Sequence, residues 1–337
     1  MITVTLFCKS EDKIAQQILE DLQSLREIVP HHVVVLDIEH YSNRQVGFQK
    51  EPVVEIGPYR LEGAIRRVDL QVALMAAQDR VTQLEQTGDK RYQRRVERGA
   101  VFSRTDRFSL WFTRYYMLLI NFLVFLYVGI PFLAPLLMKV GAEMPARVIY
   151  TVYSPLCHQL AFRSFFLFGE QLYYPRELAH IDDVLTYEEV TGSQSINLIE
   201  ARRFIGNERL GYKVALCQRD VAIYGAILLF GLFFSALGRR IKQIPWYLWI
   251  AGLVPIGLDG LSQLPGLMRS IMPGWVVIRE STPMLRLITG GIFGWMTAWY
   301  LFPLIEESML ETHQMLKRKF EKIKQTTGIT RERIDAF

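Results

Sequence analysis

The chain carries a polar stretch, YSPLCHQLAFRSFF (Tyr153–Phe166), in the middle of a long apolar region. A second stretch of the same kind, LCQRDVAIY (Leu216–Tyr224), opens a later apolar run. Together they hold Cys157 and Cys217, two of the three cysteines. Because ionisable side chains are costly next to hydrocarbon, such residues mark a site of function or assembly. The two stretches therefore decide how the apolar runs are threaded through a membrane.

The composition around them is typical of a membrane protein with charged ends. Of the 337 residues, 50% are hydrophobic and 12% are aromatic, yet both ends of the chain are rich in charge. The formal net charge of +5 comes from basic clusters that flank the apolar runs. This pattern indicates orientation in a bilayer rather than nucleic-acid binding. We expect the lipid bilayer, and no nucleic acid, to be a partner.

Four apolar runs are expected to cross a bilayer core of about 30 Å. They lie at residues 109–138, 221–237, 245–264 and 283–305. A fifth stretch, 148–169, is broken by Pro155, and its crossing would put the basic clusters at 238–242 and 317–324 outside, against the positive-inside tendency. We therefore predict four crossings, with 148–169 as a re-entrant or interfacial segment at the outer face and both termini in the cytoplasm.

The first part of the chain predicts a mixed α/β domain, because short β-branched runs alternate with a helical pattern. The expected strands are Thr3–Phe7, His32–Ile38 and a strand–turn–strand within 51–61, and the expected helices are Asp12–Leu25 and 63–84. The first two strands, joined by a helix, should be parallel.

The motifs VTLF (Val4–Phe7), VVVLD (Val33–Asp37) and PVVEI (Pro52–Ile56) resemble a small glutaredoxin-like domain. The resemblance implies a thioredoxin fold over residues 1–85. The redox pair Cys-x-x-Cys of that family is replaced here by Asp12 and Ala15, and Cys8 comes too early to belong to it. A domain without the pair favours docking of a cytoplasmic protein partner over a one-cysteine redox site.

Composition divides the chain into four parts. They are the degenerate glutaredoxin-like domain at 1–85, a basic linker at 86–108, a helical membrane domain at 109–305 with an extracytoplasmic insertion at 170–216, and an amphipathic cytoplasmic tail at 306–337. The expected fold class is multi-domain, with a cytoplasmic α/β domain of thioredoxin-like fold followed by a helical transmembrane bundle.

This topology gathers the polar residues of several segments at the outer leaflet. The redox or disulfide candidates are Cys157, Cys217 and His158. The ligand-binding candidates are Arg163, Arg219, Asp220, Tyr224, Asp259, Gln263 and Arg286. Helical spacing puts Cys217, Asp220 and Tyr224 on one face, and Gly290 with Gly294 should allow close helix contact just beneath.

The spaced motifs of this region resemble a bacterial family of predicted membrane proteins of unknown function. The motifs are CHQ (Cys157–Gln159), RSF (Arg163–Phe165), CQR (Cys217–Arg219), DGLSQ (Asp259–Gln263) and RLITG (Arg286–Gly290). The resemblance covers about 145–305 and implies membership of this family, without naming a reaction. The expected location is a bacterial cytoplasmic (inner) membrane.

Four chemistries fit these residue types. The first is a disulfide between Cys157 and Cys217, either structural or redox-active with a membrane quinone. The second is a zinc site of the same cysteines and His158, completed by Asp220 or Asp259. The third is an anionic lipid headgroup or small ligand held by the arginines. In the fourth the charges only neutralise one another.

For this fourth chemistry the expected ion pairs are Asp259 with Arg286, and Asp220 with Arg219 or Arg163. The functions that correspond to the four chemistries are thiol redox, metal or ligand binding, and a non-enzymatic scaffold or complex subunit. The residue types alone leave all of these open, enzymatic activity included.

Overall fold

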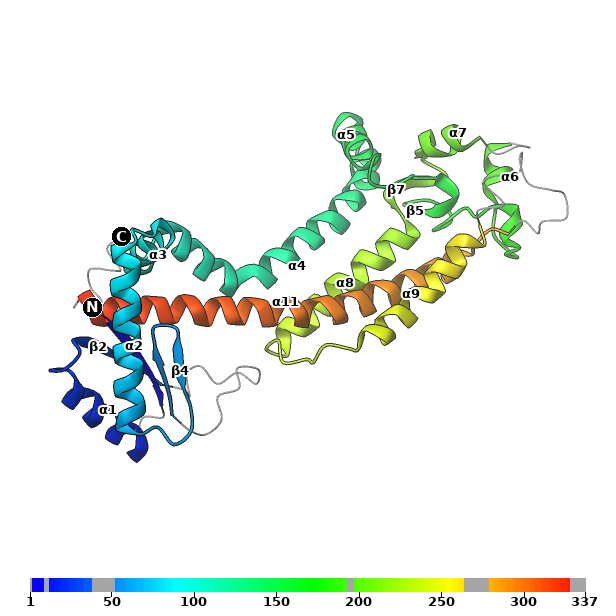
Figure 1. Cartoon of the computed structure of the whole chain (residues 1–337). Coiled ribbons are helices and arrows are strands. Elements are labelled where there is room, and N and C mark those ends of the chain that lie inside the picture. The colour runs from blue at the N-terminus through cyan, green and yellow to red at the C-terminus, as the bar shows by residue number, and fades with distance from the viewer. Residues whose placement is uncertain (1, 9–11, 38–51, 193–196, 264–278, 328–337) are drawn as a thin grey trace. The chain divides into compact units, whose positions relative to one another are not determined.

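The computed structural model describes residues 2–8, 12–37, 52–192, 197–263 and 279–327 (Figure 1). The chain divides into two compact units, one made of residues 1–114 with 309–337 and the other of residues 115–308. Two long helices, α4 (Arg104–Lys139) and α11 (Pro283–Thr327), contribute to both units. The polar stretches at 153–166 and 216–224 both lie in the second unit.

The first unit is built on a four-stranded mixed sheet of order β2-β1-β3-β4. The strands are β1 (Ile2–Cys8), β2 (His31–Asp37), β3 (Val53–Ile56) and β4 (Tyr59–Leu61). β1 is parallel to β2 and antiparallel to β3, which is antiparallel to β4. The predicted strands and the predicted parallel pair are confirmed, because buried β-branched runs fix both register and partner.

Two helices, α1 (Lys13–Leu25) and α2 (Arg67–Gln86), supply the apolar side chains that close the core of this sheet. Asp12 caps α1 by accepting the backbone N–H of Ile14 at 2.9 Å. Buried Ile18 and Leu22 of α1 and Leu70 and Leu74 of α2 join the strands in one cluster. The mixed α/β character predicted for this region is therefore present.

The basic segment after α2 and the C-terminal part of α11 are helical parts of the first unit. The segment forms α3 (Lys90–Ala100) and the start of α4. Lys319 Nζ lies 2.7 Å from the Asp106 carboxylate, and the Arg318 guanidinium lies 5.0 Å from the ring centroid of Phe7. The amphipathic tail therefore packs on the α/β domain.

Three helices of the described residues are long and apolar enough to cross a membrane: α4, α8 (Gln218–Ala236) and residues 283–324 of α11. A fourth apolar helix, α9 (Trp246–Leu261), has 16 residues. At roughly 1.5 Å per residue it spans about 24 Å, less than a bilayer core. Only the last residue of the expected third crossing, at position 264, lies outside the described part of the chain.

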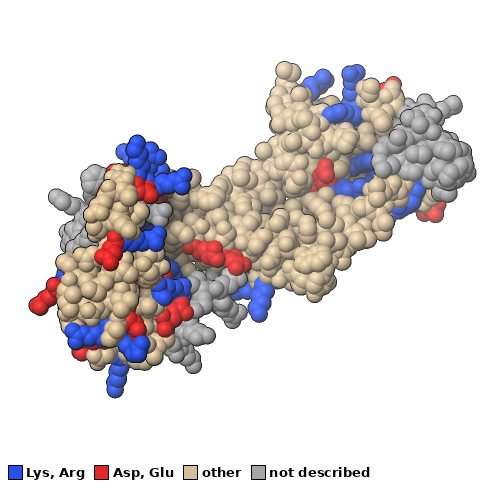
Figure 2. Space-filling model, viewed as in Figure 1, with Lys and Arg blue, Asp and Glu red and all other residues tan. Residues whose placement is uncertain are grey.

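The apolar helices present an uncharged surface. Figure 2 shows a broad expanse without blue or red over these helices in the second unit, whereas charges gather toward its β-strands. Large apolar side chains such as Leu118, Phe122 and Phe125 of α4 and Leu229 of α8 are exposed. Exposed apolar surface of this extent is typical of contact with lipid.

Two glycines let α8 and α11 pack closely. A Cβ atom added at Gly294 would lie 2.1 Å from the carbonyl oxygen of Ile223, and one added at Gly290 would lie 2.8 Å from the carbonyl oxygen of Arg219. Neither distance is compatible with a larger residue unless the backbone moves. The close helix contact predicted for these glycines is confirmed.

The rest of the second unit is a small α/β cap. Its elements are α5 (Glu143–Tyr153), a 3₁₀ turn (Ala161–Arg163), β5 (Ser164–Leu167), a second 3₁₀ turn (Glu177–Ala179), α6 (Tyr187–Thr191), α7 (Leu198–Arg203), β6 (Gly206–Asn207) and β7 (Gly211–Cys217). The strands form an antiparallel sheet of order β5-β7-β6.

This cap joins the two polar stretches directly. Residues 148–169 are not one helix, because α5 ends at Tyr153 and the chain turns into β5. β5 then pairs with β7, which places Ser164 opposite Cys217. The last strand of the segment at 170–216 therefore completes the same sheet as β5.

Candidate functional site

The cysteines of the two polar stretches meet beside the start of α8. Cys157 lies on the turn after α5, and Cys217 ends β7 and precedes the first residue of α8. The backbone N–H of Cys217 donates to Cys157 Sγ at 3.2 Å. Both sulfur atoms and a carboxylate oxygen of Asp220 lie within 4.8 Å of one another. Segments distant in sequence thus present three metal-ligand atoms to one point.

The two thiols are not bridged in this structure. Hydrogen bonding to Cys157, together with burial, raises the pKa of the Cys217 thiol well above its usual value. The raised pKa favours the protonated form, which is a poor nucleophile and a poor ligand. The Cys217 thiol would therefore have to lose this proton both to bind a metal ion and to form a disulfide.

His158 does not share the position of its neighbour Cys157. Cys157 is buried, whereas His158 is exposed and is not part of the three-ligand group. The chain turns here, because Gln159 has a positive φ of 50° and its side chain donates to the carbonyl oxygen of Tyr150 at 2.9 Å. The third ligand atom beside the cysteines therefore comes from Asp220.

Asp259 of α9 is the centre of one buried polar cluster. Its carboxylate pairs with Arg219 and, at 3.4 Å, with Arg279. Ser281 Oγ donates to it at 3.0 Å, and Gln263 Nε2 does so at 3.3 Å. The candidates Asp259, Gln263 and Arg219 are thus brought together, with Arg279 and Ser281 as additional partners.

Glu280 is the centre of a second cluster. Its carboxylate accepts from Arg163 Nε at 2.8 Å, pairs with Arg286, and lies 3.6 Å from Arg176. Arg286 is only 2% exposed and also donates to the side chain of Gln218 at 3.3 Å. Two of the candidates, Arg163 and Arg286, therefore share one acid, Glu280.

The expected ion pairs are wrong in their partners. Arg286 pairs with Glu280 and not with Asp259, and Arg219 pairs with Asp259 and not with Asp220. Successive residues of a helix point about 100° apart, so Arg219 and Asp220 face different neighbours. The sequence places Glu280 directly ahead of the fourth apolar run, at the same end as Arg286, but Arg176 carries no such signal.

Tyr224 lies one turn further along α8 from Asp220. Its ring centroid is 4.4 Å from that of Tyr127 of α4, which is 5.7 Å from that of Tyr153 of α5. This aromatic group ties α4, α5 and α8 together. It holds in place the helices that carry the cysteine cluster.

Three apolar helices of the described residues, each long enough to span a bilayer, define an integral membrane protein. Residues 206–300 match the family described as Predicted membrane protein (DUF2085). An uncharacterized protein of the archaeon Methanocaldococcus jannaschii is 30% identical over 218 residues, which are 62% of this chain and 99% of that protein. The chain belongs to this family of predicted membrane proteins. No solved structure matches it.

The family assignment confirms the membrane-protein resemblance that the sequence motifs indicated. The matched segment contains Cys217, Asp220, Asp259 and Arg286 but begins after Cys157. The function of the family is not known, so the chemistry of the site rests on its own geometry. The glutaredoxin-like resemblance of the first part of the chain stays a prediction.

Proposed function

We propose that this protein is a multi-pass membrane protein whose Cys157, Cys217 and Asp220 bind a thiophilic divalent cation of the zinc type. The observation that carries the proposal is the convergence of three ligand atoms within 4.8 Å of one another. Zinc binds sulfur at about 2.3 Å and carboxylate oxygen at about 2.0–2.2 Å, so ligands this close can share one ion.

The ligand set also suggests what the metal would do. Structural zinc sites are closed by four protein ligands, whereas catalytic sites combine three with a water molecule or substrate. Cys157, Cys217 and Asp220 supply three ligands, from a turn and from the start of a helix. A fourth, exchangeable position would make the site a place where a small molecule is bound or activated.

A disulfide between Cys157 and Cys217 is the second candidate. It is favoured by the contact between Cys157 Sγ and the backbone N–H of Cys217. Such a bridge would link the turn after α5 to the junction of β7 and α8. It would be structural in its simplest form, and quinone-coupled turnover stays a prediction.

The arrangement in the membrane is part of the same proposal. With four crossings the cysteine cluster lies at the outer face of a cytoplasmic membrane, and both termini are cytoplasmic. The domain boundaries are those predicted from composition: 1–85, 86–108, 109–305 and 306–337. Basic segments next to the apolar runs support this orientation.

The α/β domain is proposed to be a degenerate thioredoxin-like docking module. The sheet order β2-β1-β3-β4, with one parallel and two antiparallel pairs, supports the resemblance. Asp12 caps α1 where the redox pair would begin, and Cys8 is buried at 5% exposure. Both features favour a protein partner over redox chemistry in this domain.

The testing experiment measures metal content and thiol state on the same purified sample. We expect about one equivalent of metal per chain, with the cysteines alkylated without reductant only after the metal is chelated. Cys157→Ser and Cys217→Ser should each lose the metal, and Cys8→Ser is the matched control that keeps it. A 157–217 linked peptide without metal would select the disulfide, and free thiols without metal would contradict both candidates.

A further inference from the structure

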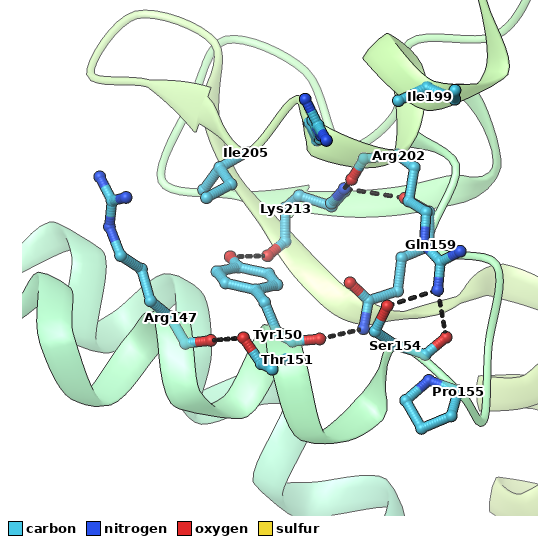
Figure 3. Close-up of a pocket in the computed structure, with 11 residues that line it drawn as sticks. Arg147, Tyr150, Thr151, Ser154, Pro155, Gln159, Ile199, Arg202, Ile205 and Lys213 are labelled. Carbon is cyan, nitrogen blue, oxygen red and sulfur yellow. Dashed lines mark hydrogen bonds between the residues drawn. The ribbon is translucent and has the colours of Figure 1, made fainter.

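A second, separate site opens between α5, α7 and β7 of the cap. It is a broad pocket of about 860 Å³ (Figure 3). Its cations are Arg147 of α5, Arg202 and Arg203 of α7, and Lys213 of β7. None of the residues that line the pocket is an aspartate or a glutamate. The wall is therefore strongly positive, which is the requirement for binding an anion.

Lys213 is the anchor of this pocket. Its side chain is 1% exposed, and its ammonium group donates to the carbonyl oxygens of Gln159 at 2.8 Å and Arg202 at 2.7 Å. An ammonium group has three N–H donors, and among the described residues only these two acceptors meet it. Burial lowers the pKa of Lys213 to about 7, as expected where the described surroundings hold no carboxylate partner.

The neighbouring cations are only partly engaged. Arg202 donates to the carbonyl oxygen of Ser154 at 2.5 Å and to its hydroxyl group. Arg147 pairs at 3.2 Å with Glu143, an exposed contact within one helix that is weak in water. Figure 3 shows the side chains of Lys213 and Arg202 next to Gln159 and Ser154 on the same wall. An anion with several oxygens would find free N–H donors here.

The helix that contributes Arg147 also carries an apolar stripe on its surface. Met144, Val148 and Val152 recur at every fourth position and are 75%, 58% and 58% exposed. Such spacing puts them on one face of α5. An exposed apolar face beside basic residues is typical of a helix that lies in the membrane interface. A lipid headgroup would therefore reach the pocket while its acyl chains contact α5.

We propose that this pocket binds a phosphoryl group, carried by the headgroup of an anionic phospholipid or by free phosphate, through Lys213, Arg202, Arg203 and Arg147. Arginine and lysine are the side chains that bind phosphate oxygens by charge-assisted hydrogen bonds. The apolar stripe of α5 favours the lipid as the source.

The test is native mass spectrometry of the full-length protein in detergent, titrated with phosphatidylglycerol or with phosphatidylcholine. We expect selective retention of phosphatidylglycerol. Loss of one charge-assisted contact costs a factor of about ten, so Arg147→Gln/Arg203→Gln should weaken retention at least tenfold. Arg209→Gln, which removes an exposed arginine outside the pocket, is the matched control.

Inorganic phosphate distinguishes the two sources. Binding of phosphate without phosphatidylglycerol, lost in the double variant, assigns the pocket to the free anion. Lys213→Met should abolish either ligand if it folds, and the double variant keeps the test valid if it does not. Equal retention by the double variant and Arg209→Gln, or equal binding of phosphatidylcholine, would overturn the proposal.

Discussion

Arg286 and Lys213 are both almost fully buried cations of the same unit, yet they differ in their partners. Arg286, which is 2% exposed, is paired with the Glu280 carboxylate. Lys213, which is 1% exposed, donates to the carbonyl oxygens of Gln159 and Arg202 and has no carboxylate partner among the described residues. The first belongs to a cluster in which each arginine contacts a carboxylate. The second faces a pocket whose lining residues include no acid.

The difference shows that a concentration of charge does not by itself mark a binding site. The arginines around Glu280 and Asp259 are numerous, but the two buried acids already occupy them. Such clusters are costly to break. A buried cation held only by carbonyl groups still gains from an incoming anion. In this unit a candidate binding residue is therefore recognised by the lack of a described carboxylate partner, and not by the number of charges around it.

The largest expected effect comes from removing Glu280, the acid that three arginines share. Glu280→Gln leaves Arg163, Arg176 and Arg286 without that carboxylate. An unpaired buried charge costs about 3–5 kcal/mol, and we expect a loss of this size in the free energy of unfolding. Thermal unfolding of the purified protein in detergent measures it.

The matched control is Glu170→Gln, which removes the partner of Arg209 from an exposed pair with 48% and 74% of the side chains accessible. Exposed pairs contribute about 0–1 kcal/mol, so its melting temperature should change little. Equal melting temperatures of Glu280→Gln and Glu170→Gln would mean that the Glu280 cluster does not stabilise the fold.

A second pair of variants separates the acid of the ion-pair cluster from the acid beside the cysteines. Asp259→Asn should lower the stability by about 2 kcal/mol, less than Glu280→Gln because Arg279 stays partly solvated. It should keep the metal. Asp220→Asn should show the reverse, with a metal affinity at least tenfold lower, about 1.4 kcal/mol, and little change in melting temperature.

Metal titration and thermal unfolding on the same two samples make this comparison. If Asp259→Asn loses the metal and Asp220→Asn keeps it, the ligand set proposed from the cysteine cluster is wrong. If both lose metal and stability together, the two clusters are one cooperative unit.

How far the sequence predicts these regions depends on whether the signal is local. The strands and helices of the α/β domain follow from alternation and spacing in runs such as Val33–Asp37, and the close contact at Gly294 follows from small residues in an apolar helix. The Cys157–Cys217 contact follows from topology. These features need no knowledge of side-chain direction.

The partners within the site could not be predicted, because they depend on directions that spacing does not fix. Arg219 and Asp220 are adjacent, yet one faces Asp259 and the other the cysteines. Arg176 reaches Glu280 from the long segment between the two cysteine motifs. The sheet that joins β5 to β7 is likewise formed between distant residues, and it brings Lys213 into the pocket wall.

A smaller effect is expected at Lys213, the buried cation without a described carboxylate partner. Lys213→Met removes a buried charge that has no described carboxylate partner, so the relief of desolvation offsets part of the two lost hydrogen bonds. The net loss of stability should be about 1 kcal/mol, well below that of Glu280→Gln. The same unfolding measurement decides the order. A loss as large as that of Glu280→Gln would show that Lys213 is a structural member of the cap.

The smallest effect is expected at His158, and it tests whether neighbours in sequence share a site. The imidazole is exposed, while the ligand atoms that converge belong to Cys157, Cys217 and Asp220. His158→Ala should therefore leave metal content and melting temperature within experimental error, in contrast to Cys157→Ser one residue away. Loss of metal from His158→Ala would identify the histidine as the fourth ligand. The site would then be closed by four protein ligands, which is the structural rather than the catalytic form of zinc coordination.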